Sequence, residues 1–260
     1  MSIAYLPKKH FGQNFLTDLR IQSKIIEHCH LTAEDTVLEI GPGQAAISRL
    51  IAPRVKRLIC VETDKDLIPA LKGEFKNAAV EIVHDDFLNI DMAQLPDGLK
   101  VIGNIPYNIS TPIIEKLIGH RNKISAAFMT VQLEFGERLA AKSGGKEYGS
   151  LTCFAQINAK IKILFKINKS AFKPVPKVDS CFISLDFKNA PPLDIKNEEQ
   201  LYRLIRTAFA QRRKNILNAL SPIYTKERVA AVLETLSIKQ TARPEQLNIE
   251  NFVALANGLV

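Results

Sequence analysis

Five short apolar runs alternate with helical segments in the first half of the chain, and this alternation restricts the possible folds more than any other feature. The runs are 36–40, 57–61, 80–83, 100–102 and 126–131. Strands that alternate with helices are typical of a mostly parallel sheet covered by helices. We therefore predict an α/β fold of the Rossmann-like type. Ligands of such sheets bind at the carboxyl ends of the strands, so the residues after each run are the first candidates for a site.

The first run continues into a glycine turn, Gly41-Pro42-Gly43, and contains an acid, Glu39. The turn lacks the third glycine of the phosphate-binding pattern G-x-G-x-x-G, which an NAD-dependent oxidoreductase would need. A ligand without phosphates fits better beside a carboxylate. S-adenosylmethionine is such a ligand, because the glycine N–H groups and Glu39 can both reach its amino-acid end.

Acids also follow the next two runs. Glu62 stands 21 positions after Gly41, where an acid of this fold can accept hydrogen bonds from both ribose hydroxyls. After the third run, Asp86 can accept from the amino group of the cofactor adenine, and Phe87 can line the base slot. Asp85 is the alternative to Asp86. Three strand ends in succession therefore favour a nucleoside cofactor.

The fourth run leads into the loop Gly103-Asn104-Ile105-Pro106-Tyr107-Asn108. The side-chain oxygen of Asn104 and the carbonyl of Pro106 can accept two hydrogen bonds from an amino group, and Tyr107 can stack on the ring that carries it. We interpret the loop as the place where an adenine amino group is methylated. The alternative is a proline turn that only ends a strand.

A second aromatic candidate lies in the segment 171–180, which contains Phe172, Pro174 and Pro176. Two spaced prolines hold this segment extended, so Phe172 would be presented on a stiff support. The alternative is a loop with one core phenylalanine.

The positive charge is concentrated in the second half of the chain. Of the net charge of +8, residues 1–155 contribute zero, because they hold 18 basic and 18 acidic residues. We predict a catalytic domain over 1–190 and a small all-helical domain over 197–260. Basic clusters are expected to contact a phosphate backbone; the candidates are Lys8, Lys9, Arg212, Arg213 and Lys214.

Other site types are not favoured. The segment His28-Cys29-His30 lacks further ligands at metal-binding spacing, so no metal site is expected. No apolar run approaches the roughly 20 residues that span a bilayer, and the first ten residues lack the apolar core of a signal peptide. We expect a cytoplasmic protein, monomeric and without a membrane partner.

Several of these segments together closely resemble the ribosomal RNA adenine N6,N6-dimethyltransferases, over nearly the whole chain. The nearest group is the bacterial one that acts on small-subunit 16S rRNA. The resemblance rests on the motifs HFGQNFL at 10–16, EIGPG at 39–43, VETD at 61–64, the acid at 86, GNIPYNIST at 103–111, AFKPVPKVDS at 171–180 and FAQRRKN at 209–215.

The resemblance implies a function and assigns residues to it. Two adjacent adenines near the 3′ end of 16S rRNA would be dimethylated with S-adenosylmethionine. Asn14, Leu16, Gly41, Glu62, Asp86 and Asn104 would line the cofactor site. Tyr107 and Phe172 would stack on the extruded adenine. The helical tail would dock on the ribosomal subunit.

Three other functions stay open at this point. The sister family that methylates 23S rRNA is the first, although HFGQNFL and QRRK favour the small-subunit group. A DNA adenine methyltransferase is the second, but its loop usually begins with an acid where Asn104 stands. The third is an RNA-binding assembly factor that keeps the fold without catalysis.

Overall fold

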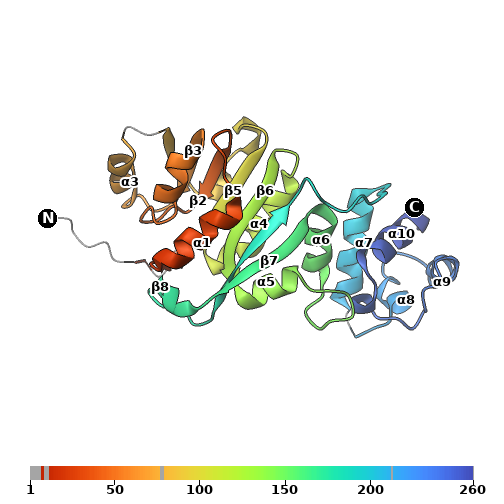
Figure 1. Ribbon diagram of the computed structural model, residues 1–260. Helices are drawn as coiled ribbons and strands as arrows, with labels where there is room; N and C mark the ends of the chain where they lie inside the picture. Colours follow the sequence, from red (N-terminus) through yellow and green to blue (C-terminus); the bar gives the residue numbers. More distant parts are fainter. Residues whose placement is uncertain (1–6, 9–11, 77–78, 212, 260) are drawn as a thin grey trace. The chain divides into compact units, whose positions relative to one another are not determined.

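The computed structural model describes residues 7–8, 12–76, 79–211 and 213–259. Contacts within the chain divide it into two compact units (Figure 1). The first combines Met1–Gly136 with Lys160–Asn189, and the second combines Glu137–Ala159 with Ala190–Val260. Each unit has an apolar core of its own.

A seven-stranded sheet forms the centre of the first unit, in the order β4-β3-β2-β5-β6-β9-β7. The strands are β2 Thr36–Ile40, β3 Arg57–Glu62, β4 Val80–His84, β5 Leu99–Asn104, β6 Ile124–Gln132, β7 Lys160–Ile167 and β9 Ser180–Asp186. The first five strands in this order, β4, β3, β2, β5 and β6, run parallel to one another. The last two are antiparallel to their neighbours, β9 to β6 and β7 to β9. The predicted α/β fold is confirmed, and the order of the parallel strands reverses between β2 and β5, where such sheets bind ligands.

The helices of this unit are short and amphipathic. They are α1 Leu19–Cys29, α2 Ser48–Ile51, α3 Ile68–Glu74 and α4 Ser110–Gly119; α5, Leu133–Leu139, spans the division between the units. Asp18 caps α1 by accepting hydrogen bonds from the N–H groups of Arg20 and Ile21. Ile25, Ile26 and Cys29 of α1 are buried in the same apolar cluster as side chains of β6, β7 and β9.

A two-stranded ribbon, which the sequence did not predict, links the segment 171–180 to the part of the chain before α1, which we call the amino-terminal arm. β1, Phe15–Leu16, pairs antiparallel with β8, Phe172–Lys173. The N–H of Thr17 extends the pairing with a 2.8 Å hydrogen bond to the carbonyl of Ala171. The pairing fixes the arm beside the carboxyl ends of the central strands, because Phe15 and Leu16 both face the cavity found there.

The second unit is helical: α6 Ser150–Asn158, α7 Glu198–Ala210, α8 Ile216–Ala219, α9 Lys226–Thr235 and α10 Ile249–Gly258. The predicted domain 1–190 needs a correction, because residues 137–159 belong to this unit. Tyr148, Cys153 and Ile157 are buried in one apolar cluster with residues of α7 and α10. In the described part of the chain, no helix is both long enough and apolar enough to cross a membrane.

Candidate active site

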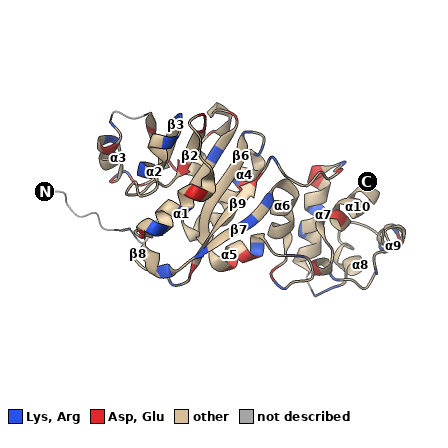
Figure 2. Ribbon diagram, viewed as in Figure 1, with Lys and Arg blue, Asp and Glu red and all other residues tan. Residues whose placement is uncertain are grey.

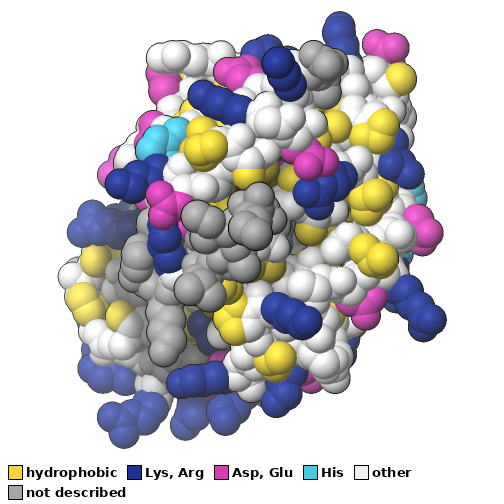
Figure 3. Space-filling view, turned by 90° about the vertical axis from the view of Figure 1, so that its left-hand side faces the viewer, with side chains coloured by type: hydrophobic (Ala, Val, Ile, Leu, Met, Phe, Trp, Pro, Cys, Tyr) yellow, Lys and Arg dark blue, Asp and Glu magenta, His cyan; other side chains and the backbone are white. Residues whose placement is uncertain are grey.

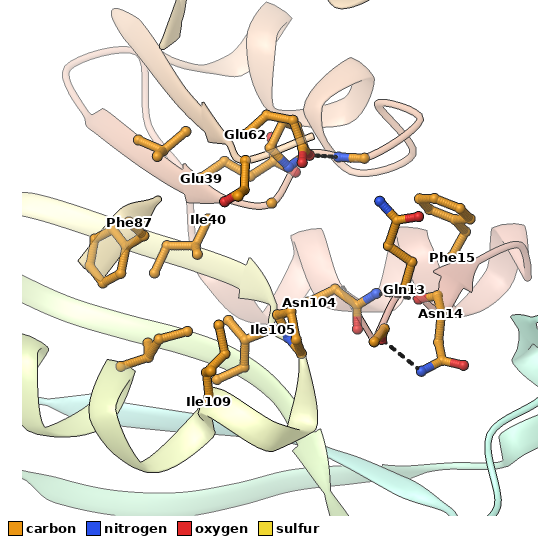
Figure 4. A pocket seen from close by; sticks show the side chains of 18 of the residues that line it. Gln13, Asn14, Phe15, Glu39, Ile40, Glu62, Phe87, Asn104, Ile105 and Ile109 are labelled. Atoms are coloured by element: carbon orange, nitrogen blue, oxygen red, sulfur yellow. Dashed lines mark hydrogen bonds between the residues drawn. The ribbon is translucent and has the colours of Figure 1, made fainter. Parts of the chain in front are cut away.

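A cavity of about 280 Å³ opens at the carboxyl ends of β2, β3 and β5, between these strands and the arm (Figure 4). Glu39 and Glu62 lie on one side of it, Asn14 and Asn104 on another, and Ile40, Phe87 and Ile109 form an apolar wall. All the residues that the sequence predicted for the cofactor line this cavity: Asn14, Leu16, Glu39, Gly41, Gly43, Glu62, Asp86, Phe87 and Asn104.

The glycine turn after β2 needs its glycines. Gly41 and Gly43 have φ angles of 68° and 56°, which side chains other than glycine rarely adopt. A Cβ atom on Gly43 would also lie 2.9 Å from Cε1 of Phe15. The turn therefore lets the ring of Phe15 pack directly on the backbone and holds the arm against this side of the cavity.

Glu62, the last residue of β3, is buried, with 6% of its surface exposed. Its two carboxylate oxygens accept hydrogen bonds from the N–H of Gly43 at 3.0 Å and from the N–H of Asp64 at 2.8 Å. Burial raises the pKa of this carboxyl, and the hydrogen bonds partly offset that effect. Each oxygen keeps a second lone pair, so the fixed carboxylate can still accept hydroxyl donors such as those of a ribose.

Glu39 is more deeply buried and more strongly perturbed. Its exposed fraction is 3%, and the Cys60 thiol contacts Oε2 at 3.6 Å. Burial raises the pKa of Glu39 to about 7, and the nearby Glu62 charge adds to the shift. A cation in the cavity would stabilise the ionised form of this carboxyl.

The structure distinguishes the two acids after β4. Asp86 lines the cavity, and one of its oxygens accepts from the N–H of Leu88 at 2.9 Å. Asp85 is exposed, is not part of the lining, and accepts from the N–H of Asp86 at 2.7 Å. Asp86 rather than Asp85 is therefore placed to meet a ligand, beside the buried ring of Phe87.

The amide of Asn104 is oriented by the arm. Its Nδ2 donates to the main-chain carbonyl of Asn14 at 2.8 Å, and Nδ2 of Asn14 donates to the carbonyl of Gly12 at 3.1 Å. This hydrogen bond fixes which end of the Asn104 amide is the NH₂ group. The other end, Oδ1, is the acceptor that a ligand can use. Among the described residues, no donor contacts this oxygen.

The rest of the loop differs in part from the prediction. Tyr107 is half-buried, and its hydroxyl lies 2.7 Å from Oγ of Ser180, which fixes the ring at the cavity. The Pro106 carbonyl, predicted as the second acceptor, already accepts from the N–H of Ile109 at 3.2 Å and from Oγ of Ser110 at 3.3 Å. A substrate amino group would have to share this oxygen with both donors.

Phe172 does not lie where the sequence suggested. The prediction placed it against the target base, but its ring is fully buried and is absent from the cavity lining. It packs in the apolar core of the first unit with Leu16, Ala171 and Phe182. The pairing of β8 with β1 explains the difference, because it turns this segment into part of a packed ribbon rather than an exposed loop.

The arm is also tied to the loop after β3. Nζ of Lys8 lies 2.6 Å from carboxylate oxygens of both Asp64 and Asp66, and Nε2 of Gln13 donates to Asp64 at 3.1 Å. These contacts raise the pKa of Lys8. The prediction of Lys8 as an RNA contact is therefore weakened, because two carboxylates already neutralise its charge. This role of Asp64 was not predicted from the sequence.

Of the remaining predicted RNA contacts, the structure describes two. Lys9 and Arg212 lie outside the described residues. Arg213 and Lys214 are exposed between α7 and α8 of the second unit. Across the described ranges, no group of three or more His, Cys, Asp or Glu residues could hold a metal ion.

The family model for ribosomal RNA adenine dimethylase matches residues 6–259, nearly the whole chain. The chain belongs to this family. Its relatives include the "Ribosomal RNA small subunit methyltransferase A" of Fusobacterium nucleatum, which is 40% identical over 253 residues. This match covers 95% of this chain and 96% of the relative. The protein of that name from Pseudomonas aeruginosa is also 40% identical, over 97% of this chain and 94% of its own.

Solved structures show the same fold. A dimethyladenosine transferase from Plasmodium falciparum superimposes with a TM-score of 0.80 at 27% identity, over 93% of this chain and 95% of its own. The 23S rRNA methyltransferase ErmE superimposes with a TM-score of 0.76 at 28% identity, over 95% of this chain and 99% of its own. The fold is therefore shared with a protein named for 23S rRNA, whereas the curated relatives are named for the small subunit, so the fold alone does not choose between these targets.

Proposed function

We propose that this protein transfers methyl groups from S-adenosylmethionine to N6 of two adjacent adenines near the 3′ end of 16S rRNA, giving N6,N6-dimethyladenosine. The single observation that carries the proposal is the orientation of Asn104. Its oxygen is the free acceptor at a cavity whose other walls are suited to a nucleoside cofactor. The names of the curated relatives support the small-subunit target.

The residues present fit S-adenosylmethionine. Glu62 is a fixed carboxylate for the ribose hydroxyls, and Asp86 with Phe87 suits the adenine. Glu39 is a buried acid that a cation would stabilise, as the ammonium of the amino-acid end would do. When bound, the cofactor supplies a methyl group on a positively charged sulfur. No metal is needed for this transfer, and we propose none.

The chain's own contribution is the positioning of the target amine. Adenine N6 is a weak nucleophile because its lone pair is delocalised into the ring. Accepting an N6 hydrogen at Oδ1 of Asn104 localises the lone pair and directs it along the line of transfer. The second hydrogen meets a main-chain carbonyl of the same loop, that of Pro106 or of Ile105 before it. Tyr107 stacks on the ring as positive charge develops.

Further features of the proposal follow from this chemistry. A monomethylated N6 has one hydrogen left, so Asn104 must hold it while the methyl turns toward the apolar lining residues Ile109 and Ile113. The adenine must be unpaired or flipped to enter the cavity. Arg213 and Lys214 in the second unit contact the RNA backbone, and the protein acts as a monomer in the cytoplasm.

The test is transfer of labelled methyl groups to four substrates in parallel: unmethylated small subunits, naked 16S rRNA, 23S rRNA and duplex DNA. We expect labelling of small subunits, with or without labelling of naked 16S rRNA. Labelling of 23S rRNA alone would contradict the proposed target and favour the sister activity. Absence of labelling on every substrate, with binding to small subunits intact, would favour a non-catalytic assembly factor.

A further inference from the structure

A run of lysines without any acid begins on β7, the last strand in the order of the sheet, and continues beyond it. Residues 160–177 contain six lysines and no Asp or Glu. All six are exposed: Lys160, Lys162, Lys166, Lys169, Lys173 and Lys177. The first three lie on β7, which ends the strand order of the sheet (Figure 2). This surface, which we call the lysine strip, takes no part in the cavity.

The register of β7 places its lysines on both faces of the edge. Lys162 pairs with Ser184 and Phe165 with Phe182, so Lys162 and Phe165 share one face, whereas Lys166 pairs with Cys181 on the other. An irregularity between Ile163 and Phe165 causes the change of face. A polyanion lying along the edge would therefore meet ammonium groups from both sides.

Helix α1 adds basic groups to one of these faces. Nζ of Lys24 lies 4.3 Å from the centroid of the Phe165 ring, and the ring of His28 lies 5.2 Å from it. Three acids lie close in sequence, pairing or contact: Glu27 on α1, Asp186 opposite Lys160, and Asp179, which accepts a hydrogen bond from the N–H of Lys169 at 2.9 Å. The carboxylate of Asp186 accepts hydrogen bonds from Asn189 at 2.8 and 3.2 Å.

Lysines on an edge strand also have a simpler explanation, since they prevent sheets from pairing edge to edge. Two observations go beyond it. The run continues for three lysines past the end of the strand, and Lys24 comes from a helix, which has no edge to protect. A lysine excess is also not general, because acidic and basic side chains both occur over the upper part of the face in Figure 3.

The strip leads to the cavity. β7 continues through residues 168–171 into β8, which pairs with the cavity-lining residues Phe15 and Leu16 of β1. From Lys160 to Lys166 a strand rises about 20 Å, a length over which a nucleic-acid strand carries several phosphates. The length of the edge thus matches a short stretch of nucleic-acid backbone.

We propose that the lysine strip binds the phosphate backbone of the rRNA strand that carries the target adenines. The proposal deepens the proposed function and rests on it for the identity of the RNA. It assigns to the first unit a grip on the RNA that does not depend on the basic segment between α7 and α8.

The test compares two variants of equal charge. Lys160, Lys162 and Lys166 are replaced together by glutamine in one variant; in the control, the exposed Lys65, Lys72 and Lys76 are replaced in the same way. Binding to small subunits is measured against salt concentration. Each lost phosphate contact should reduce the slope of log K against log salt by about 0.7 to 0.9, so we expect the loss of three contacts in the strip variant to reduce it by about 2.1 to 2.7. The control should match the wild type.

Equal slopes and affinities for the strip variant and the control would overturn the proposal. Self-association of the strip variant with unchanged RNA affinity would also overturn it, in favour of edge protection. Lys24→Gln exposes no strand edge, and we expect it to reduce the slope by about 0.7 to 0.9. Cofactor affinity should be unchanged in all variants. If the lysine replacements weaken binding to small subunits as expected but the wild type methylates no subunits, the proposed function is wrong and the RNA-binding role of the lysine strip is still supported.

Discussion

The side-chain amide of Asn104 donates a 2.8 Å hydrogen bond to the main-chain carbonyl of Asn14, 90 residues earlier in the chain. This bond joins the amino-terminal arm to the loop after β5 and decides which atom of the amide faces the cavity. The same arm is tied to Asp64 through Lys8 and Gln13. The arm therefore connects the cofactor side of the cavity with the residue proposed to hold the target amine.

Loosening the arm should affect both cofactor binding and transfer. Gln13→Glu would place a second carboxylate about 3 Å from Asp64, which is 1% exposed. We expect KM for S-adenosylmethionine to rise about tenfold, equivalent to about 1.4 kcal/mol, and kcat to fall because Asn14 no longer orients Asn104. Steady-state methylation kinetics measure both effects.

Asp64→Asn, added to Gln13→Glu, should restore the affinity for the cofactor. In the double variant Gln13→Glu with Asp64→Asn, the amide introduced at position 64 can donate to the carboxylate introduced at position 13. KM should then return to within a few fold of the wild type. Asp66→Asn removes only the exposed partner of Lys8 and serves as the control. If KM of the double variant is no lower than that of Gln13→Glu alone, the hydrogen bond between positions 13 and 64 does not support cofactor binding.

The carboxyl of Glu39 should make stability depend on pH. Its pKa is raised by burial to about 7 in the folded protein, from 4.5. The folded state then binds more protons than the unfolded state between these values, so the free energy of unfolding falls as pH rises through this window, by up to about 3 kcal/mol. Urea unfolding between pH 4.5 and 7 should show a smaller decrease in Glu39→Gln than in the wild type, because the variant keeps only the contribution of Glu62, whose pKa burial also raises.

Cofactor affinity should change with pH in the opposite direction. A bound ammonium favours ionised Glu39, so the affinity of the wild type should increase from pH 5.5 to 7, and that of Glu39→Gln should increase less. Calorimetric titration at several pH values measures this. An identical pH dependence in the two proteins would remove Glu39 from the cofactor site.

Phe172 should prove to be mainly a core residue. Its ring is fully buried, so Phe172→Ala should reduce the free energy of unfolding by about 3–5 kcal/mol. Phe172→Leu keeps most of the apolar volume and should retain near-normal stability and transfer. If Phe172→Leu is stable but loses most of its activity, the ring stacks on the base after all, and the ribbon must open during the reaction.

The strand ends were predictable from sequence because their periodicity and polarity are local. Glycines after β2 and acids after β3 and β4 follow from where a parallel sheet places ligands. The β1–β8 ribbon was not predictable, since two residues per strand carry no periodic signal. The burial of Phe172 and the Asn14–Asn104 bond depend on that ribbon, so they could not be inferred either.

The measurement that tests the central claim most directly is nucleoside analysis of small-subunit rRNA after reaction with S-adenosylmethionine. The wild type should produce two N6,N6-dimethyladenosines per small-subunit rRNA. Asn104→Ala should reduce its formation by about 10²–10³-fold while cofactor affinity stays within a few fold. Asn122→Ala, an exposed amide outside the cavity, should match the wild type. Near-normal dimethylation by Asn104→Ala would contradict the account.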